Sequence, residues 1–250
     1  MKFIPAICTT TVLAVAAGWL GGCQPVASSA PASQLPVQAQ WHSQQLDCQQ
    51  PLFINQQQWQ LQNLRFYLSD FSLNQQPLLL ASSTWQQPRL ALLGTDCQGN
   101  SNWQLAFSQP VTAGKLSFTL GLPFALNHQN PLSANTPLNH SELFWSWQLG
   151  YKFLRLDMQG PDHGWAFHLG STGCQSASVL RPPTSPCQAA NTVVITLDYL
   201  PGQQLTLDLA ALLNEVEINR HSSCMSDRQQ QSCQRLLHNV NQPQLWSVLP

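Results

Sequence analysis

The sequence predicts an all-β fold, namely an antiparallel β-sandwich or barrel-like single domain with short helical segments near the C-terminus. Short apolar runs alternate with polar turns roughly every 8 to 12 residues, a spacing typical of sandwiches and barrels. Hydrophobic residues make up 43% of the 250 residues, which is enough to form a core. No repeat and no break in composition divides residues 41–250, so we expect a single domain over that range.

The strands are expected where apolar side chains recur between turn signals. The first clear one covers residues 64–73, where apolar and polar side chains partly alternate before a turn at residues 74–77. Further strands are expected over the apolar or aromatic runs at residues 78–81, 89–93, 103–107, 115–124, 143–156, 164–169 and 193–200.

The C-terminal part predicts two helices. After a turn at residues 201–202, an alternating strand over residues 205–209 leads into a short apolar segment. Asp208 can cap a short helix there, over residues 210–213, because its carboxylate can accept hydrogen bonds from the first free backbone N–H groups. A second helix is expected over residues 227–240.

The composition excludes two classes of protein. Charged residues make up only 8% of the chain, and 10 Lys and Arg nearly balance 11 Asp and Glu. We therefore expect no nucleic-acid partner, since nucleic-acid binders carry a basic surface. The 9 Trp and 10 Phe also exclude disorder of the highly charged kind, which contains few aromatic residues.

The N-terminal residues predict export. Residues 1–22 carry an early Lys2, an apolar stretch and small residues, as a signal peptide does. The sequence Leu20-Gly21-Gly22-Cys23 resembles the lipobox of bacterial lipoproteins, which implies cleavage before Cys23 and lipidation of its thiol. The absence of Asp after Cys23 favours an outer-membrane anchor, facing the periplasm or the cell surface. Residues 23–40, rich in Ser, Ala, Pro and Gln, predict a flexible tether. An ordinary signal peptide or a membrane anchor is the alternative.

Six cysteines remain in the exported domain, an even number that predicts disulfide bonds. Proximity along the chain favours Cys174–Cys187 and Cys224–Cys233, which leaves Cys48 and Cys97 as the third pair. A thiolate metal site is the alternative, but the chain contains no C-x-x-C pair.

Three motifs in the middle of the chain attract attention because they combine histidine with aromatic residues. They are Phe124-Ala-Leu-Asn-His128, Phe144-Trp-Ser-Trp-Gln-Leu-Gly-Tyr-Lys-Phe153 and Phe167-His-Leu-Gly-Ser-Thr-Gly-Cys174. Together with the upstream run at residues 64–70, these motifs resemble the MbnP-like family. That family comprises the four-Cys partner proteins of the "metallo-mystery pair" systems, and the resemblance covers roughly residues 63–209.

The resemblance implies a copper-binding domain over residues 41–250. It also implies a partner, a MauG/MbnH-like dihaem enzyme of the cytochrome c peroxidase family, that oxidises a tryptophan of the copper protein to kynurenine. Carried over to this chain, the ligand candidates are His128 and His168, and the tryptophan candidates are Trp145 and Trp147. Both indoles are expected on the same face of one strand, because side chains alternate with a period of two.

The chemistry of these residue types is consistent with copper. Imidazole nitrogen suits copper, whereas intact indole offers only an N–H donor, so ring opening to an aryl amine and a ketone would create new donor atoms. Asp157 and Glu142 flank the aromatic strand, and we expect both to face solvent, with orientation of a histidine as the alternative.

The other histidines receive lesser roles. His140 and His163 are reserve candidates for metal ligands. No functional role is expected for His42, His221 and His238. We expect no enzyme, since Ser171 does not sit in a G-x-S-x-G elbow. The alternative function is a metal-independent envelope lipoprotein that binds a glycan or a protein partner.

Overall fold

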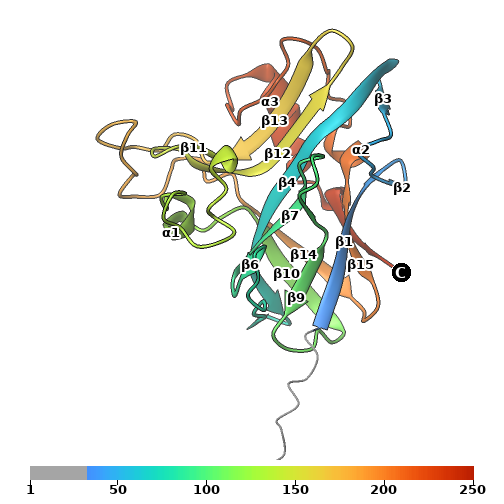
Figure 1. Cartoon of the computed structure of the whole chain (residues 1–250), viewed down its shortest axis with the longest axis vertical. Coiled ribbons are helices and arrows are strands. Elements are labelled where there is room, and N and C mark those ends of the chain that lie inside the picture. The colour runs from blue at the N-terminus through green and yellow to red at the C-terminus, as the bar shows by residue number, and fades with distance from the viewer. Residues whose placement is uncertain (1–32) are drawn as a thin grey trace, which may run out of the picture. The chain divides into compact units, whose positions relative to one another are not determined.

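Two β-sheets packed around a shared apolar core form the molecule. A computed structural model describes residues 33–250, and Figure 1 shows their arrangement. The predicted signal peptide and Cys23 lie outside these described residues, as does residue range 23–32 of the predicted tether. No helix in residues 33–250 is long and apolar enough to span a membrane.

The larger sheet is organised around one long strand, β4 (Gln57–Leu73). It pairs with β12 (Gly150–Gln159), β10 (Gly114–Leu120) and β7 (Leu90–Thr95), all antiparallel. Residues 63–69 of β4 are all buried, because both faces of the strand are covered there. This explains why the sequence alternates only partly in that region. The remaining strands of this sheet are β3 (Leu52–Ile54), β5 (Gln76–Pro77), β6 (Gln86–Gln87), β8 (Ser101–Asn102), β11 (Phe144–Ser146), β13 (Gly164–Gly170) and β14 (Val193–Tyr199).

The smaller sheet is built on β1 (Ser33–Trp41), which pairs in parallel with β15 (Gln204–Asp208). Its other strands are β2 (Gln44–Gln45), β9 (Gln104–Phe107) and β16 (Trp246–Leu249), and all of their pairings are antiparallel.

Aromatic side chains fix the packing of one sheet on the other. Trp246 of β16 lies edge-on to Phe66 of β4 and to Phe118 of β10, with ring centroids 5.5 and 5.4 Å apart. Phe107 of β9 meets Phe71 of β4 at 5.5 Å. The predicted all-β class is therefore confirmed, in the form of two open sheets packed face to face.

The predicted tether was wrong for its last residues. Residues 33–40 belong to β1, where Leu35, Val37 and Ala39 point into the core. Pro36 and the interspersed glutamines conceal this alternation in the sequence. The strand gains stability from pairing on both sides, with β9 and with β15, rather than from its own composition.

Both predicted helices exist, with shifted boundaries. Helix α2 (Leu209–Leu212) is capped by Asp208, whose carboxylate accepts hydrogen bonds from the N–H groups of Ala210 and Ala211. Helix α3 (Gln231–Val240) begins four residues later than predicted. The Asp227 side chain accepts a bond from the N–H of Gln229, which favours a turn over a helix there.

The remaining helical segments are single turns near the aromatic strand and the C-terminus. They are α1 (Phe124–Asn127), η1 (Ser141–Leu143) and η2 (Pro243–Leu245).

The three disulfides are those that proximity favoured. They join Cys48 to Cys97, Cys174 to Cys187 and Cys224 to Cys233. The last of these connects α3 to a segment that runs beside β13, where the backbone N–H of His168 donates to the carbonyl of Cys224. This disulfide therefore helps to fix one of the two histidines singled out in the sequence.

Candidate metal centre

His168 lies on β13 with its two ring nitrogens in contrasting surroundings. Its Nε2 is 2.6 Å from Oδ1 of Asp157, on the neighbouring strand β12. Its Nδ1 is buried and has no hydrogen-bond partner within residues 33–250. A neutral imidazole that donates from Nε2 carries its lone pair on Nδ1. The carboxylate thus presents Nδ1 as an acceptor or ligand atom that no protein group uses.

Asp157 is itself held in place by a second partner. Its Oδ2 accepts a hydrogen bond from Nε of Arg155 at 2.6 Å, while Oδ1 faces His168. Burial favours the protonated carboxyl, but the hydrogen bond from His168 and the charge of Arg155 outweigh burial and hold the pKa of Asp157 below its usual value. The carboxylate is therefore charged at neutral pH and can orient the imidazole.

Trp145 covers the same end of β13. Its ring centroid lies 6.3 Å from that of His168. A Cβ atom placed on Gly170 would come within 2.5 Å of Cζ3 of the indole, so the ring rests directly on this glycine. Trp145 is half-buried, which places its indole beside His168 and leaves part of it accessible to solvent.

Asn127, at the end of α1, connects the aromatic strand to the segment after β13. It is 1% exposed, and its Oδ1 accepts a hydrogen bond from the N–H of Tyr151 at 2.8 Å. Its Nδ2 lies within hydrogen-bond distance of the carbonyl of Leu149 and of Oγ of Ser171. The buried amide therefore holds α1, the turn after β11 and the residues after β13 together.

His128 follows Asn127, whose Nδ2 lies 3.3 Å from Nε2 of the imidazole. Its Nδ1 is 3.4 Å from the carbonyl oxygen of Trp147, and its Nε2 is 3.8 Å from Sγ of Cys187. Burial lowers the pKa of His128, and the hydrogen bond to the Trp147 carbonyl only partly offsets this effect. The imidazole is therefore neutral at pH 7, the form that binds metal.

The two tryptophans do not share a face, so that expectation was wrong. Strand β11 ends at Ser146 and its pairing with β12 is irregular, which places Trp147 in the turn that follows. Trp147 packs edge-on against Phe144 with ring centroids 5.7 Å apart, whereas Trp145 packs toward His168. The indole of Trp145 therefore lies beside His168, whereas Trp147 contacts His128 through its backbone carbonyl.

The two acidic residues do not simply face solvent, contrary to our expectation. Each contacts a histidine: Asp157 binds His168, and Glu142 lies 3.2 Å from Nδ1 of His140. Glu142 also forms an ion pair at 2.6 Å with Arg65, whose side chain is only 4% exposed.

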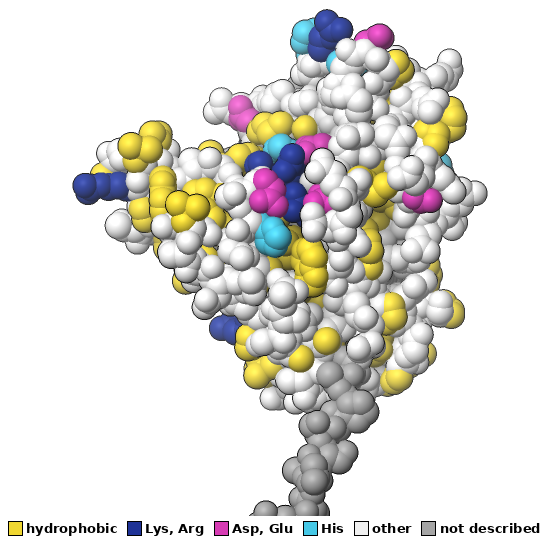
Figure 2. Space-filling model, viewed as in Figure 1, with side chains coloured by type: hydrophobic (Ala, Val, Ile, Leu, Met, Phe, Trp, Pro, Cys, Tyr) yellow, Lys and Arg dark blue, Asp and Glu magenta, His cyan; other side chains and the backbone are white. Residues whose placement is uncertain are grey.

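Figure 2 shows one face of the molecule, on which basic, acidic and histidine side chains lie together. The structure has a cavity of about 340 Å³ with several charged lining residues. Its charged lining residues are Arg65, Asp96, Glu142, Arg155 and Asp157.

The two reserve ligands pack against tryptophans other than Trp145 and Trp147. His140 stacks on Trp85, with ring centroids 5.8 Å apart and planes inclined by 12°. His163 meets Trp59 edge-on at 5.3 Å. Within residues 33–250, neither His140 nor His163 has a hydrogen-bond partner or a ring contact in common with His128 or His168.

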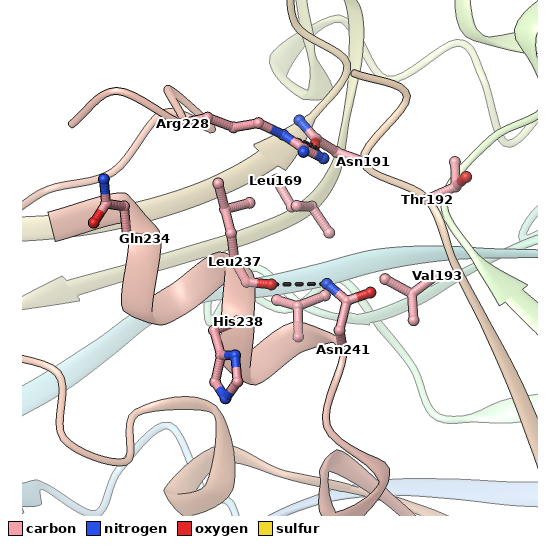
Figure 3. Close-up of a pocket in the computed structure, with 10 residues that line it drawn as sticks. Leu169, Asn191, Thr192, Val193, Arg228, Gln234, Leu237, His238 and Asn241 are labelled. Atoms are coloured by element: carbon pink, nitrogen blue, oxygen red, sulfur yellow. Dashed lines mark hydrogen bonds between the residues drawn. The ribbon is translucent and has the colours of Figure 1, made fainter. Parts of the chain in front are cut away.

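A separate cavity of about 330 Å³ lies beside α3 and is drawn in Figure 3. Arg228 donates two hydrogen bonds to Oδ1 of Asn191 there, and Nδ2 of Asn191 donates to the carbonyl of Gly170. His238 also lines this cavity.

Sequence reasoning missed three features of the site. It gave no role to Asn127, although this residue lies inside one of the motifs. It treated Asp157 as solvent-facing, and it did not foresee that the Cys174–Cys187 disulfide lies beside His128. Of these features, only the contact between Asp157 and His168 could have been inferred from strand alternation. Asp157 of β12 pairs with Ala166 of β13, which is two residues from His168.

The fold and the site together define a β-sandwich protein with an edge rich in imidazole and indole groups. A family model described as MbnP matches residues 31–226, so the chain belongs to the MbnP family. MbnP from Methylosinus trichosporium has a similar solved structure, with a TM-score of 0.73 and 22% sequence identity. The match covers 88% of this chain and 98% of that chain, and it shows a shared fold. No curated protein matches the chain.

The residues present fit a copper ion of the kind that the family implies. The buried Nδ1 of His168 lacks a protein partner, and Asp157 orients the ring through the opposite nitrogen. This arrangement, a carboxylate behind an imidazole, is typical of metal-ligating histidines.

Proposed function

We propose that this protein binds copper through His168 and His128 and has no catalytic activity of its own. The observation that carries the proposal is the unpartnered Nδ1 of His168, buried beside Trp145 and oriented by Asp157. Membership of the MbnP family supports a copper-associated role. His128 would contribute Nε2, since its Nδ1 faces the Trp147 carbonyl. A copper ion held there would be available for storage, delivery or sensing in the envelope.

We propose Trp145, rather than Trp147, as the residue that a partner enzyme oxidises to kynurenine. The reasons are its position beside His168 and its partial exposure, which together give an oxidant access to a ring that adjoins a ligand. Two equivalents of hydrogen peroxide are reduced to water as the C2–C3 bond of the indole breaks and each of these carbons gains an oxygen atom. Hydrolysis of the resulting N-formyl group then releases C2 as formate. The products are an aryl amine and a ketone, both of which can donate electron pairs to a metal.

The partner that fits this chemistry is a dihaem enzyme of the MauG/MbnH type, because haem is a redox cofactor that can drive an oxidation by peroxide.

We further propose that lipidated Cys23 anchors the domain at the bacterial outer membrane. Replacement of Cys23 with Ser should release the protein from the membrane fraction, and continued retention would argue against the lipid anchor.

Copper titration of oxidised protein, co-expressed with its partner enzyme, tests the main proposal. Competition against a chelator of known affinity should show one tightly bound copper, and His168→Ala should remove most of the affinity. His238→Ala provides a matched control, since His238 is exposed and its side chain bonds only to Gln242, in the turn after helix α3. Equal affinities for wild type, His168→Ala and His238→Ala would reject the site and favour the metal-independent binding role.

A further inference from the structure

The Cys174–Cys187 disulfide lies against the ring of His128. Cys187 Sγ is 3.8 Å from Nε2 of this histidine, and the imidazole donor and both sulfur atoms all lie within 4.8 Å of one another. Within residues 33–250, no other group of three or more histidine, cysteine or acidic side chains approaches so closely. The other two disulfides therefore have no comparable imidazole neighbour.

We propose that reduction of this disulfide creates a second type of metal site, in which Cys174, Cys187 and His128 bind a soft cation, Cu⁺ or Zn²⁺. A dithiol reductant supplies two electrons and two protons, the S–S bond breaks, and the reductant becomes a disulfide. The two new thiols release their protons when the metal binds. Thiolate and imidazole are the donors that these cations prefer.

The donors in the oxidised protein already lie near the separations that such a site requires. Metal–sulfur and metal–nitrogen bonds of about 2.3 and 2.0 Å place tetrahedral donors roughly 3.5 to 4 Å apart. The distance from Cys187 Sγ to His128 Nε2 is in this range. The two sulfur atoms, now bonded, must separate, while Cys174 Sγ already lies within 4.8 Å of the imidazole donor.

The backbone around the two cysteines is held by contacts that do not depend on the disulfide. Thr172 and Ala189 exchange two backbone hydrogen bonds, of 2.9 and 3.0 Å, and the N–H of Gln188 donates to the carbonyl of Gly173. The carbonyl of Cys174 also accepts a hydrogen bond from the Gln148 side chain. We therefore expect the thiols to stay adjacent after reduction.

The histidine is also held independently of the disulfide. Asn127, the residue before His128, is buried and is held by its contacts with Tyr151 and Ser171. The carbonyl of Trp147 faces Nδ1 of His128. Nε2 consequently remains directed toward the sulfur atoms when the S–S bond is broken.

The location of the disulfide allows a reductant to reach it. Cys187 is half-buried, whereas Cys174 is 4% exposed, so attack should occur at the sulfur of Cys187. Residues 175–186 between them carry the exposed Val179 and Leu180, and their recorded hydrogen bonds are all internal to that segment. Within residues 33–250, no hydrogen bond therefore connects this segment to the sheets. By contrast, Cys224 and Cys233 are both fully buried.

The experiment uses the exported domain, reduced under anaerobic conditions by a mild dithiol that is then removed. Alkylation and mass spectrometry should show Cys174 and Cys187 as the free thiols. Titration with Co²⁺ should produce thiolate-to-metal charge-transfer absorption, which Zn²⁺ abolishes and which oxidised protein lacks. Cu⁺ should displace Co²⁺ as well.

Matched variants separate this site from the copper site of the oxidised protein. His128→Ala should weaken Co²⁺ binding by about 100-fold, since it removes a donor and even outer partners are typically worth 10- to 100-fold. The double variant Cys174→Ser with Cys187→Ser should show no charge-transfer band, while His168→Ala should bind Co²⁺ like wild type.

Three outcomes would overturn the inference. They are absence of the band in protein whose Cys174 and Cys187 are shown to be free, a band that persists in the double cysteine variant, and preferential reduction of another disulfide. Near-ultraviolet circular dichroism of each variant verifies the fold. Copper binding by oxidised protein is measured separately, so failure of that proposal does not affect this result.

Discussion

Asp157 and His168 form the most direct carboxylate–imidazole contact of the candidate centre, with 2.6 Å between Oδ1 and Nε2. The contact joins neighbouring strands β12 and β13, and Arg155 occupies the second carboxylate oxygen. The imidazole is therefore constrained in orientation and in the position of its proton. The free nitrogen, Nδ1, is the one that lies buried without a partner.

Replacement of Asp157 with Ala should lower copper affinity by about 10- to 100-fold, because the ring would lose the group that orients it and that favours Nδ1 as donor. Asp157→Asn should lose less, since the amide oxygen can still accept a hydrogen bond from Nε2. Chelator competition on oxidised protein measures both affinities. Identical losses for Ala and Asn would show that charge matters more than orientation, and no loss for Ala would contradict the role given to Asp157.

The two tryptophans should differ in their modification. Protein produced with an active partner enzyme should carry kynurenine within the peptide that contains residues 144–148, and Trp147→Phe should leave this modification in place. Trp145→Phe should abolish it, because Trp147 lies in the turn and packs on Phe144 rather than beside His168. Peptide mass mapping of both variants decides the matter. Kynurenine that persists in Trp145→Phe would move the assignment to Trp147.

Local sequence patterns predicted much of this molecule. The apolar runs gave most strands, Asp208 gave the cap of α2, and proximity gave two disulfides with the third by remainder. These features depend on neighbours in the sequence, and therefore the sequence displays them.

The features that sequence reasoning missed depend on distant partners. Strand β1 gains its stability by pairing with β15, about 170 residues away, so its Pro- and Gln-rich sequence resembles a tether. The period-two rule placed Trp145 and Trp147 on one face, yet β11 ends between them, where a turn anchored by Asn127 begins. The same buried amide brings His128 to the Cys174–Cys187 disulfide, and no local pattern records that approach.

Asn127→Ala should destabilise the domain by about 2–4 kcal/mol, because it leaves a buried backbone N–H and other polar groups without partners. It should also lower copper affinity by displacing His128. Urea denaturation measures the free energy of unfolding. Asn241→Ala is the matched control, since Asn241 is exposed and its side chain bonds only to the carbonyl of Leu237. It should change stability by less than about 1 kcal/mol. A similar loss in both variants would contradict the connecting role of Asn127.

The ion pair between Glu142 and Arg65 should make stability depend on pH in the acid range. Arg65 is 4% exposed, and Glu142 lies 2.6 Å from it at the end of η1. Burial alone would raise the pKa of Glu142, but backbone hydrogen bonding and Arg65 hold it below the ordinary value of 4.5. A carboxyl whose pKa is lower in the folded state contributes stability above its unfolded pKa. That contribution disappears as the pH falls through the folded-state pKa.

Glu142→Gln should therefore cost about 1 kcal/mol at pH 7, an amount reduced by the partial exposure of Glu142. The difference from wild type should shrink as the pH is lowered from 4.5 through the depressed pKa, because the wild-type carboxyl then becomes neutral as well. Glu215→Gln provides the control: it breaks an equivalent ion pair, with Arg235 at 3.0 Å, in which both side chains are about half exposed or more. Its effect should stay below about 0.5 kcal/mol at every pH. Urea denaturation at several pH values measures the free energy of unfolding of each variant. If the loss of unfolding free energy in Glu142→Gln were constant from neutral to acid pH, the carboxylate charge would not be what stabilises buried Arg65.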